Sequence, residues 1–257
     1  MKYSIIILSS FLLILASCEK ETIPPASFTN SGTANNPSSN DNNTSSKAIL
    51  VDASKDGGVW WFPQSSLTGF SSVNPHQGKA LADYLRSLGF EVDELPRGVI
   101  ITDELLSKYS KVIRATAYFS YTSEEVAAYQ TFLKRSSSLF LISDHLQNSP
   151  NDQLSISLDL AFEGSFYGPV TTFQQHPITN GVSSQGFNAG SVLKTWDQSK
   201  VTPLGLLNFQ SGTEFITAVA MGIRNHPNSK IFFIGDLNGV EEVPQPFTQN
   251  VVEWLFK

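Results

Sequence analysis

Three short apolar runs that each end in an aspartate constrain the fold of this chain more than any other feature. They occupy residues 47–52, 138–144 and 230–236 and end at Asp52, Asp144 and Asp236. A short apolar run bounded by polar residues is typical of a strand that is buried on both faces of a parallel sheet. Such a sheet needs helices on both faces. The runs therefore predict an α/β fold.

Helical patterns alternate with these runs. Residues 77–88 carry apolar side chains at helical spacing, and Gly89 follows as a C-terminal stop. Residues 90–95 and 111–115 read as two further strands. Thr122-Ser-Glu-Glu125 has the pattern of a capping box, which opens a helix that runs to about residue 134. This alternation, with a closing helix over about 247–256, predicts a doubly wound and mostly parallel sheet.

Residues 155–210 break this rhythm, because short apolar pieces alternate there with Gly, Pro and Asn. This composition predicts an irregular or β-rich excursion rather than further βα units. His176-Pro177 and His226-Pro227 read as turns, so their histidines are expected to form local hydrogen bonds.

The N-terminal sequence predicts a lipid anchor. An apolar run over residues 5–16 leads to Leu15-Ala16-Ser17-Cys18, which resembles a bacterial lipobox and contains the only cysteine of the 257 residues. We expect residues 1–17 to be a removed signal peptide, Cys18 to be lipidated, and the protein to be an outer membrane lipoprotein facing the periplasm or the cell surface. The alternative is an ordinary secretory signal with an unpaired cysteine.

The rest of the chain is predicted to be a tether and one domain. Residues 18–46 are rich in Ser, Asn, Thr and Pro, so they bury too little apolar surface to offset the entropy of ordering. Residues 47–257 suit a single α/β domain. The formal net charge of −6, without a cluster of basic residues, argues against nucleic acid as a partner.

The aspartates that end the three runs are the first candidates for a site. Ligands of open α/β sheets bind beyond the carboxyl ends of the strands, where Asp52, Asp144 and Asp236 would converge. His76 and Gln77 come after the first strand and His145 directly follows Asp144, and these three residues are further ligand-binding candidates. The structural alternative is that the aspartates cap the next segment, or that one of them neutralises Arg114 in the third strand.

Metal ions and nucleotide cofactors have little support in the sequence. No histidines occur at a metal-binding spacing, and no glycine-rich phosphate loop or Gly-x-Ser-x-Gly elbow is present. Trp60 and Trp61 form a second candidate site, because flat aromatic faces suit sugar rings or partner surfaces. The alternative is that both tryptophans pack beneath the long loop that contains them.

Three segments together resemble a known superfamily. They are residues 47–52, residues 121–144 with the helix and the run Leu-Phe-Leu-Ile-Ser-Asp144, and Gly-Asp236 followed by Gln249-Asn-Val-Val-Glu-Trp-Leu255. They resemble the class I glutamine amidotransferase-like superfamily, and within it the non-catalytic DUF4350-type branch of bacterial envelope proteins with its gliding-motility and intraflagellar-transport relatives. The resemblance implies a flavodoxin-like, amidotransferase-like domain. True amidotransferases need a cysteine on a Gly-x-Cys-x-Gly turn, which this chain lacks, so glutamine hydrolysis by the family mechanism is excluded. The acidic residues after Cys18 resemble the export signals of Bacteroidota lipoproteins.

These observations favour a binding protein without catalytic residues, held at the membrane by its lipid and bound to a glycan or an envelope protein. The alternative is a hydrolase that acts on a glycan. In that case two of the carboxylates of Asp52, Asp144, Asp236 and Glu214 would serve as acid and base or would hold a cation.

Overall fold

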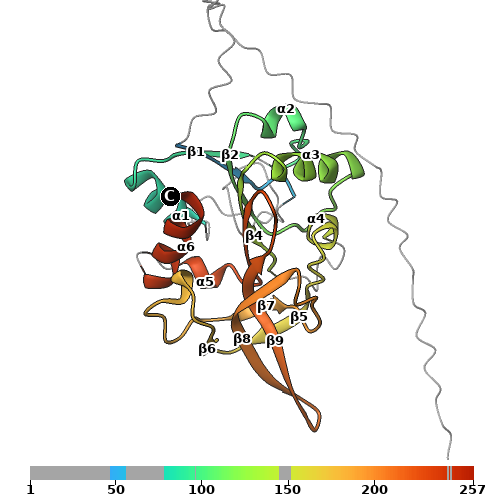
Figure 1. Ribbon diagram of the computed structural model, residues 1–257, viewed down its shortest axis with the longest axis vertical. Helices are drawn as coiled ribbons and strands as arrows, with labels where there is room; N and C mark the ends of the chain where they lie inside the picture. The colour runs from blue at the N-terminus through green and yellow to red at the C-terminus, as the bar shows by residue number, and fades with distance from the viewer. Residues whose placement is uncertain (1–46, 56–77, 96, 145–151, 242, 244) are drawn as a thin grey trace, which may run out of the picture. The chain divides into compact units, whose positions relative to one another are not determined.

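A central sheet of eight strands organises the described part of the protein, in the order β2-β1-β3-β4-β10-β9-β8-β6 (Figure 1). The computed structural model describes residues 47–55, 78–95, 97–144, 152–241, 243 and 245–257. The first five strands of the sheet are parallel to one another. Their bounds are β1 Ala48–Asp52, β2 Glu91–Leu95, β3 Lys111–Arg114, β4 Ser138–Ile142 and β10 Lys230–Ile234. The predicted strands and their mostly parallel pairing are confirmed.

Three antiparallel strands continue this sheet beyond β10. They are β9 Glu214–Arg224, β8 Val201–Ser211 and the short β6 Thr172–Phe173. A separate two-stranded antiparallel sheet pairs β5 Glu163–Tyr167 with β7 Asn188–Val192. The predicted excursion is therefore β-rich. Its longest strand, β8, joins the central sheet because it forms a long hairpin with β9.

Helices cover both faces of the sheet and enclose a hydrophobic core on each. One face packs against α1 Lys79–Ser87, α5 Asn238–Glu241 and α6 Pro246–Phe256, and the other against α2 Asp103–Leu106, α3 Ser123–Leu133 and α4 Gln153–Ser157. Successive strand residues point to opposite faces. Phe140 accordingly joins the first core and Leu141 the second. This alternation confirms the doubly wound arrangement.

Local signals in the sequence match the elements that they predict. Thr122 and Glu125 form the capping box at the start of α3, and Gly89 ends the α1 region with a φ of +85°. His176 and His226 each accept a hydrogen bond at Nδ1 from a backbone N–H two residues on, as expected of turn histidines. The short helices α2 and α4 were not predicted, because one turn gives too little periodicity to detect.

The Asn-x-x-x-Trp-Leu pattern of the last helix has a structural role. The Asn250 Nδ2 in α6 donates to the carbonyl oxygens of Ile178, at 3.1 Å, and Asn180, at 2.8 Å. Trp254 meets the ring of His176 edge-on at 5.5 Å between centroids. These contacts fasten the 3-10 turn η1 Pro177–Thr179 to α6. No helix in the described ranges is long and apolar enough to cross a membrane.

Candidate functional site

The carboxyl ends of β1, β3, β4 and β10 lie side by side, because these strands are consecutive neighbours in the parallel part of the sheet. Asp52 ends β1, and Asp144 and Asp236 follow the adjacent strands β4 and β10 by two residues. The sequence placed these three aspartates at one edge of the sheet. Five other candidates and the lipidation site lie outside the described residues, namely Trp60, Trp61, His76, Gln77, His145 and Cys18.

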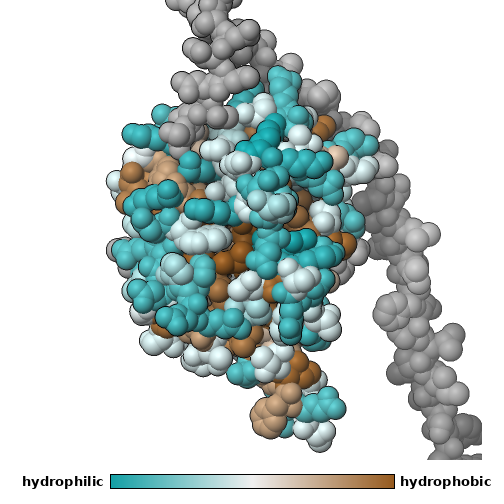
Figure 2. Space-filling model, viewed as in Figure 1, coloured by the Kyte–Doolittle hydropathy of each residue, from teal (hydrophilic) through white to brown (hydrophobic). Residues whose placement is uncertain are grey.

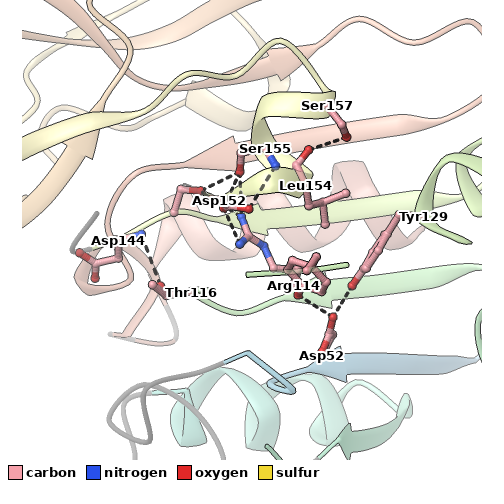
Figure 3. A network of polar contacts seen from close by, with 11 residues as sticks. Asp52, Arg114, Thr116, Tyr129, Asp144, Asp152, Leu154, Ser155 and Ser157 are labelled. Carbon is pink, nitrogen blue, oxygen red and sulfur yellow. Dashed lines mark hydrogen bonds and ion pairs between the residues drawn. The ribbon is translucent and has the colours of Figure 1, made fainter. Parts of the chain in front are cut away.

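Asp52 is buried in a network of side-chain hydrogen bonds. One carboxylate oxygen accepts the hydroxyls of Tyr129, at 2.6 Å (Figure 3), and Tyr121, at 2.8 Å. The other oxygen accepts the backbone N–H of Ser54 at 2.9 Å. Burial and the nearby Asp52 charge raise the pKa of both tyrosines well above its ordinary value, so both remain neutral donors. All of these contacts are internal, which matches the structural alternative for Asp52.

Arg114 pairs with an aspartate that the sequence did not single out. Its Nη1 lies 2.6 Å from Oδ2 of Asp152, and its Nη2 donates to the hydroxyls of Ser143 and Ser155 at 3.0 and 3.1 Å (Figure 3). Burial would lower the pKa of Arg114, but the facing carboxylate more than compensates and raises it. The guanidinium therefore stays charged in the interior.

The geometry of the sheet explains this choice of partner. Arg114 and Asp52 are register partners on parallel strands, so both side chains point to the face that α3 and α4 cover. The aspartate takes its partner Tyr129 from α3, whereas the arginine takes Asp152 from the N-cap of α4. The expectation that one of the three strand-end aspartates neutralises Arg114 is therefore wrong, because the counter-ion is Asp152 at the N-cap of α4.

Asp144 joins the end of β4 to the segment after β10. Its Oδ2 accepts the backbone N–H of Leu237 at 3.0 Å, and its backbone forms an isolated antiparallel bridge with Gly190. In Figure 3 its carboxylate points away from Arg114. Asp144 thus brings the chain that follows β10 close to the start of β7.

Asp236 holds two asparagines through their backbones. It is fully buried, and its Oδ1 accepts the N–H of Asn238 at 2.8 Å while its Oδ2 accepts the N–H of Asn188. Burial raises its pKa to about 7, and the charge of Glu241 adds to this, although the two backbone donors act in the opposite direction. The carboxylate therefore fixes the relative position of β7 and α5.

A polar pocket lies directly beside these two asparagines. Its volume is about 370 Å³. The Nδ2 of Asn238 donates to Oε2 of Glu241 at 2.7 Å, so an amide and a carboxylate form one wall. The described residues that line the pocket contribute amides, a hydroxyl and one carboxylate but no basic side chain; the polar ones are Ser184, Gln185, Asn188, Asn238, Glu241 and Gln245.

Two backbone positions around the pocket are sterically restricted. Ala189 has a φ of +61°, a left-handed conformation that costs free energy for a residue with a Cβ. Gly235 has no room for a side chain, because a Cβ there would lie 1.7 Å from the carbonyl oxygen of Ser191. These two positions let β7 approach β10 closely enough for Asn188 to reach Asp236.

The pocket offers hydrogen bonds, but no assembled nucleophile or metal centre accompanies it. In the described ranges, no three residues among His, Cys, Asp and Glu gather closely enough to hold a metal ion. Glu214, the fourth carboxylate of the hydrolase alternative, begins β9 beside the hairpin turn and is exposed. Sequence reasoning missed Gln185, Asn188, Glu241 and Gln245.

Comparison with known proteins supports the fold. No protein-family model matches the sequence, and no curated protein matches it. Among solved structures, the mmIFT52 N-terminal domain superposes with a TM-score of 0.59 at 14% identity, over 81% of this chain and 97% of that domain.

Two bacterial proteins have similar folds. A ThuA-like protein from Bacteroides uniformis gives a TM-score of 0.53 at 14% identity and covers 82% of this chain and 90% of its own. The cytoplasmic protein STM1381 from Salmonella typhimurium LT2 gives 0.52 at 13% identity and covers 82% and 99%. Because ThuA-like proteins are amidotransferase-like, this chain has the class I glutamine amidotransferase-like fold.

Proposed function

We propose that this protein is an outer membrane lipoprotein, lipidated at Cys18, whose amidotransferase-like domain binds a glycan without catalysing a reaction. We place it with the DUF4350-type envelope proteins of Bacteroidota. The observation that carries the glycan assignment is the polar pocket beside Asp236. Its amides and single carboxylate match the hydroxyl groups of a neutral sugar, and the described lining offers no basic group for phosphate.

Asp236 supports a binding role rather than a chemical one. Both of its oxygens accept backbone N–H groups, and the side chain is fully buried behind Asn188 and Asn238. A general acid must reach the atom that it protonates. In this geometry Asp236 is a positioning residue that presents the two asparagine side chains to the pocket.

A glycan array probed with the purified full-length chain tests the proposal. We expect saturable binding that Asn188→Ala and Asn238→Ala each weaken about tenfold, because each variant removes one amide but keeps the backbone N–H that Asp236 accepts. Gln198→Ala is the matched control, since this exposed amide lines a different cavity of about 350 Å³ beside Trp196.

The other outcomes separate the alternatives. Binding that Gln198→Ala abolishes and the asparagine variants leave intact would move the site to the cavity beside Trp196. Turnover of the bound sugar would support the hydrolase. If no glycan of the array binds, the glycan proposal is contradicted and an envelope protein is favoured as the partner.

A further inference from the structure

Tyr167 is a large exposed aromatic residue at the edge of the small sheet. It is 68% exposed, and its side chain forms no hydrogen bond or ring contact with any described residue. Burial of apolar surface is favourable, so an exposed aromatic side chain of this size is a candidate for contact with a ligand. Tyr167 ends β5 and precedes Gly168, whose N–H bonds to the carbonyl oxygen of Phe187 at 2.9 Å.

The register of the small sheet places Tyr167 next to the pocket. Tyr167 is the antiparallel partner of Asn188, which lines the pocket, and both side chains are exposed. Directly opposed residues in a regular antiparallel pair lie on the same face, with Cβ atoms about 5 Å apart. In this sheet the register shifts by one residue between Phe166 and Tyr167, directly before the pair of Tyr167 with Asn188. Tyr167 does not line the pocket itself, so it lies outside the pocket, paired with the lining residue Asn188.

The volume of the pocket limits what it holds. Pockets for small ligands range from about 300 to 1,000 Å³, and this one, at about 370 Å³, lies near the lower end. It suits the end of a glycan rather than several sugar units. A longer chain that leaves the pocket past Asn188 would reach Tyr167.

We propose that Tyr167 forms a second sugar subsite, on which the unit next to the pocket-bound end of an oligosaccharide stacks its C–H face. The inference rests on the proposed glycan function and adds an order to it: amides bind the terminal unit, and the aromatic ring binds the next one. A flat aromatic face buries the apolar C–H groups of a sugar ring at little cost in side-chain entropy. This is the role that the sequence suggested for Trp60 and Trp61.

The test is how affinity depends on oligosaccharide length. We would take the tightest-binding oligosaccharide of the array and its stepwise shortened forms down to the monosaccharide, and titrate each into the full-length chain by calorimetry. Stacking that covers about 50 Å² of a sugar ring is worth roughly tenfold in affinity. We expect that gain between the monosaccharide and the disaccharide, its loss in Tyr167→Ala and its retention in Tyr167→Phe.

A second exposed aromatic residue provides the control. Phe215, at 84% exposure, lies beside the turn of the β8–β9 hairpin, along which apolar surface extends in Figure 2. Phe215→Ala should leave the gain intact. If the monosaccharide binds but the gain is absent, or if Tyr167→Ala retains it, the second subsite is refuted while the pocket stands. If no sugar binds at all, the proposed function fails, and the subsite fails with it.

Discussion

Two polar regions lie at the same edge of the sheet and differ in what satisfies their charges. Under α3 and α4, side chains satisfy most of the charge, because the hydroxyls of Tyr121 and Tyr129 donate to Asp52 and Asp152 faces Arg114. Beside α5, Asp236 bonds with backbone N–H groups of the segments that form a pocket. The first region encloses all of its groups, whereas the second turns its asparagine side chains outward. Aspartates at the ends of parallel strands therefore bond either with side chains of the covering helices or with the backbone of neighbouring segments, according to which elements cover them.

We expect the largest effect on stability from removing Asp152, which lies in the first region. Asp152→Ala leaves the Arg114 guanidinium buried without its counter-ion and also removes the N-cap of α4. We expect the free energy of unfolding to fall by about 3–5 kcal/mol, measured by urea denaturation. Asp83→Ala, which breaks an exposed ion pair with Lys79, should leave the midpoint within experimental scatter.

A double variant sharpens this prediction. Arg114→Met combined with Asp152→Leu removes both buried charges and should recover much of the lost stability. If Asp152→Ala is as stable as the parent chain, the pair with Arg114 does not stabilise the fold.

The second region should show opposite effects of pH on stability and on binding. The folded pKa of Asp236, about 7, lies above the ordinary value for an aspartate, about 3.9. Between these values the folded state keeps a proton that the unfolded state has lost, so the contribution of Asp236 to stability falls as pH rises from about 4 to 7. Asp236→Asn should remove this pH dependence. Between pH 5 and pH 8 the free energy of unfolding of the variant should therefore fall by roughly 2 kcal/mol less than that of the parent chain.

Ligand binding should change in the other direction. A protonated Asp236 carries a hydroxyl in place of one carboxylate oxygen and accepts one of the two backbone N–H groups more weakly, so the anchor of Asn188 or Asn238 weakens and sugar affinity should fall as pH drops below about 7. Calorimetric titrations at pH 5 and pH 8 measure this change. Affinity that does not vary with pH would show that Asp236 does not position the pocket.

The smallest expected effect on stability comes from removing a single tyrosine hydroxyl, and it should differ between Tyr129 and Tyr167. Tyr129→Phe removes one of two phenol donors to the buried Asp52 and should cost about 1.5 kcal/mol of unfolding free energy. Tyr167→Phe removes an exposed hydroxyl that bonds with none of the described residues and should leave stability unchanged. Equal values for the two variants, again from urea denaturation, would contradict the contrast between the two regions.

Strand and helix placement was predictable where patterns are local. The runs that became β1, β4 and β10 needed only apolar composition, and the capping box of Thr122 and Glu125 appears within four residues. The sequence did not predict that β8 and β9 form a hairpin within the sheet. The pairing of β8 depends on the strand that follows it, and no pattern within β8 itself indicates that partner. The candidate site was predictable only in part. Asp236 was found from its strand, whereas Asn188 and Gln185 come from the irregular excursion, where no periodic signal marks them.

The sequence by itself determined the α/β class, the three aspartates at one edge and the absence of an amidotransferase cysteine, because each is written in composition or in short-range spacing. Only the tertiary structure decided which aspartate serves which purpose. Asp152 reaches Arg114 across 38 residues of sequence, and Asn188 reaches Asp236 across 48. Partners that far apart are brought together by the packing of helices and of the small sheet against the strands, and no local pattern encodes that packing.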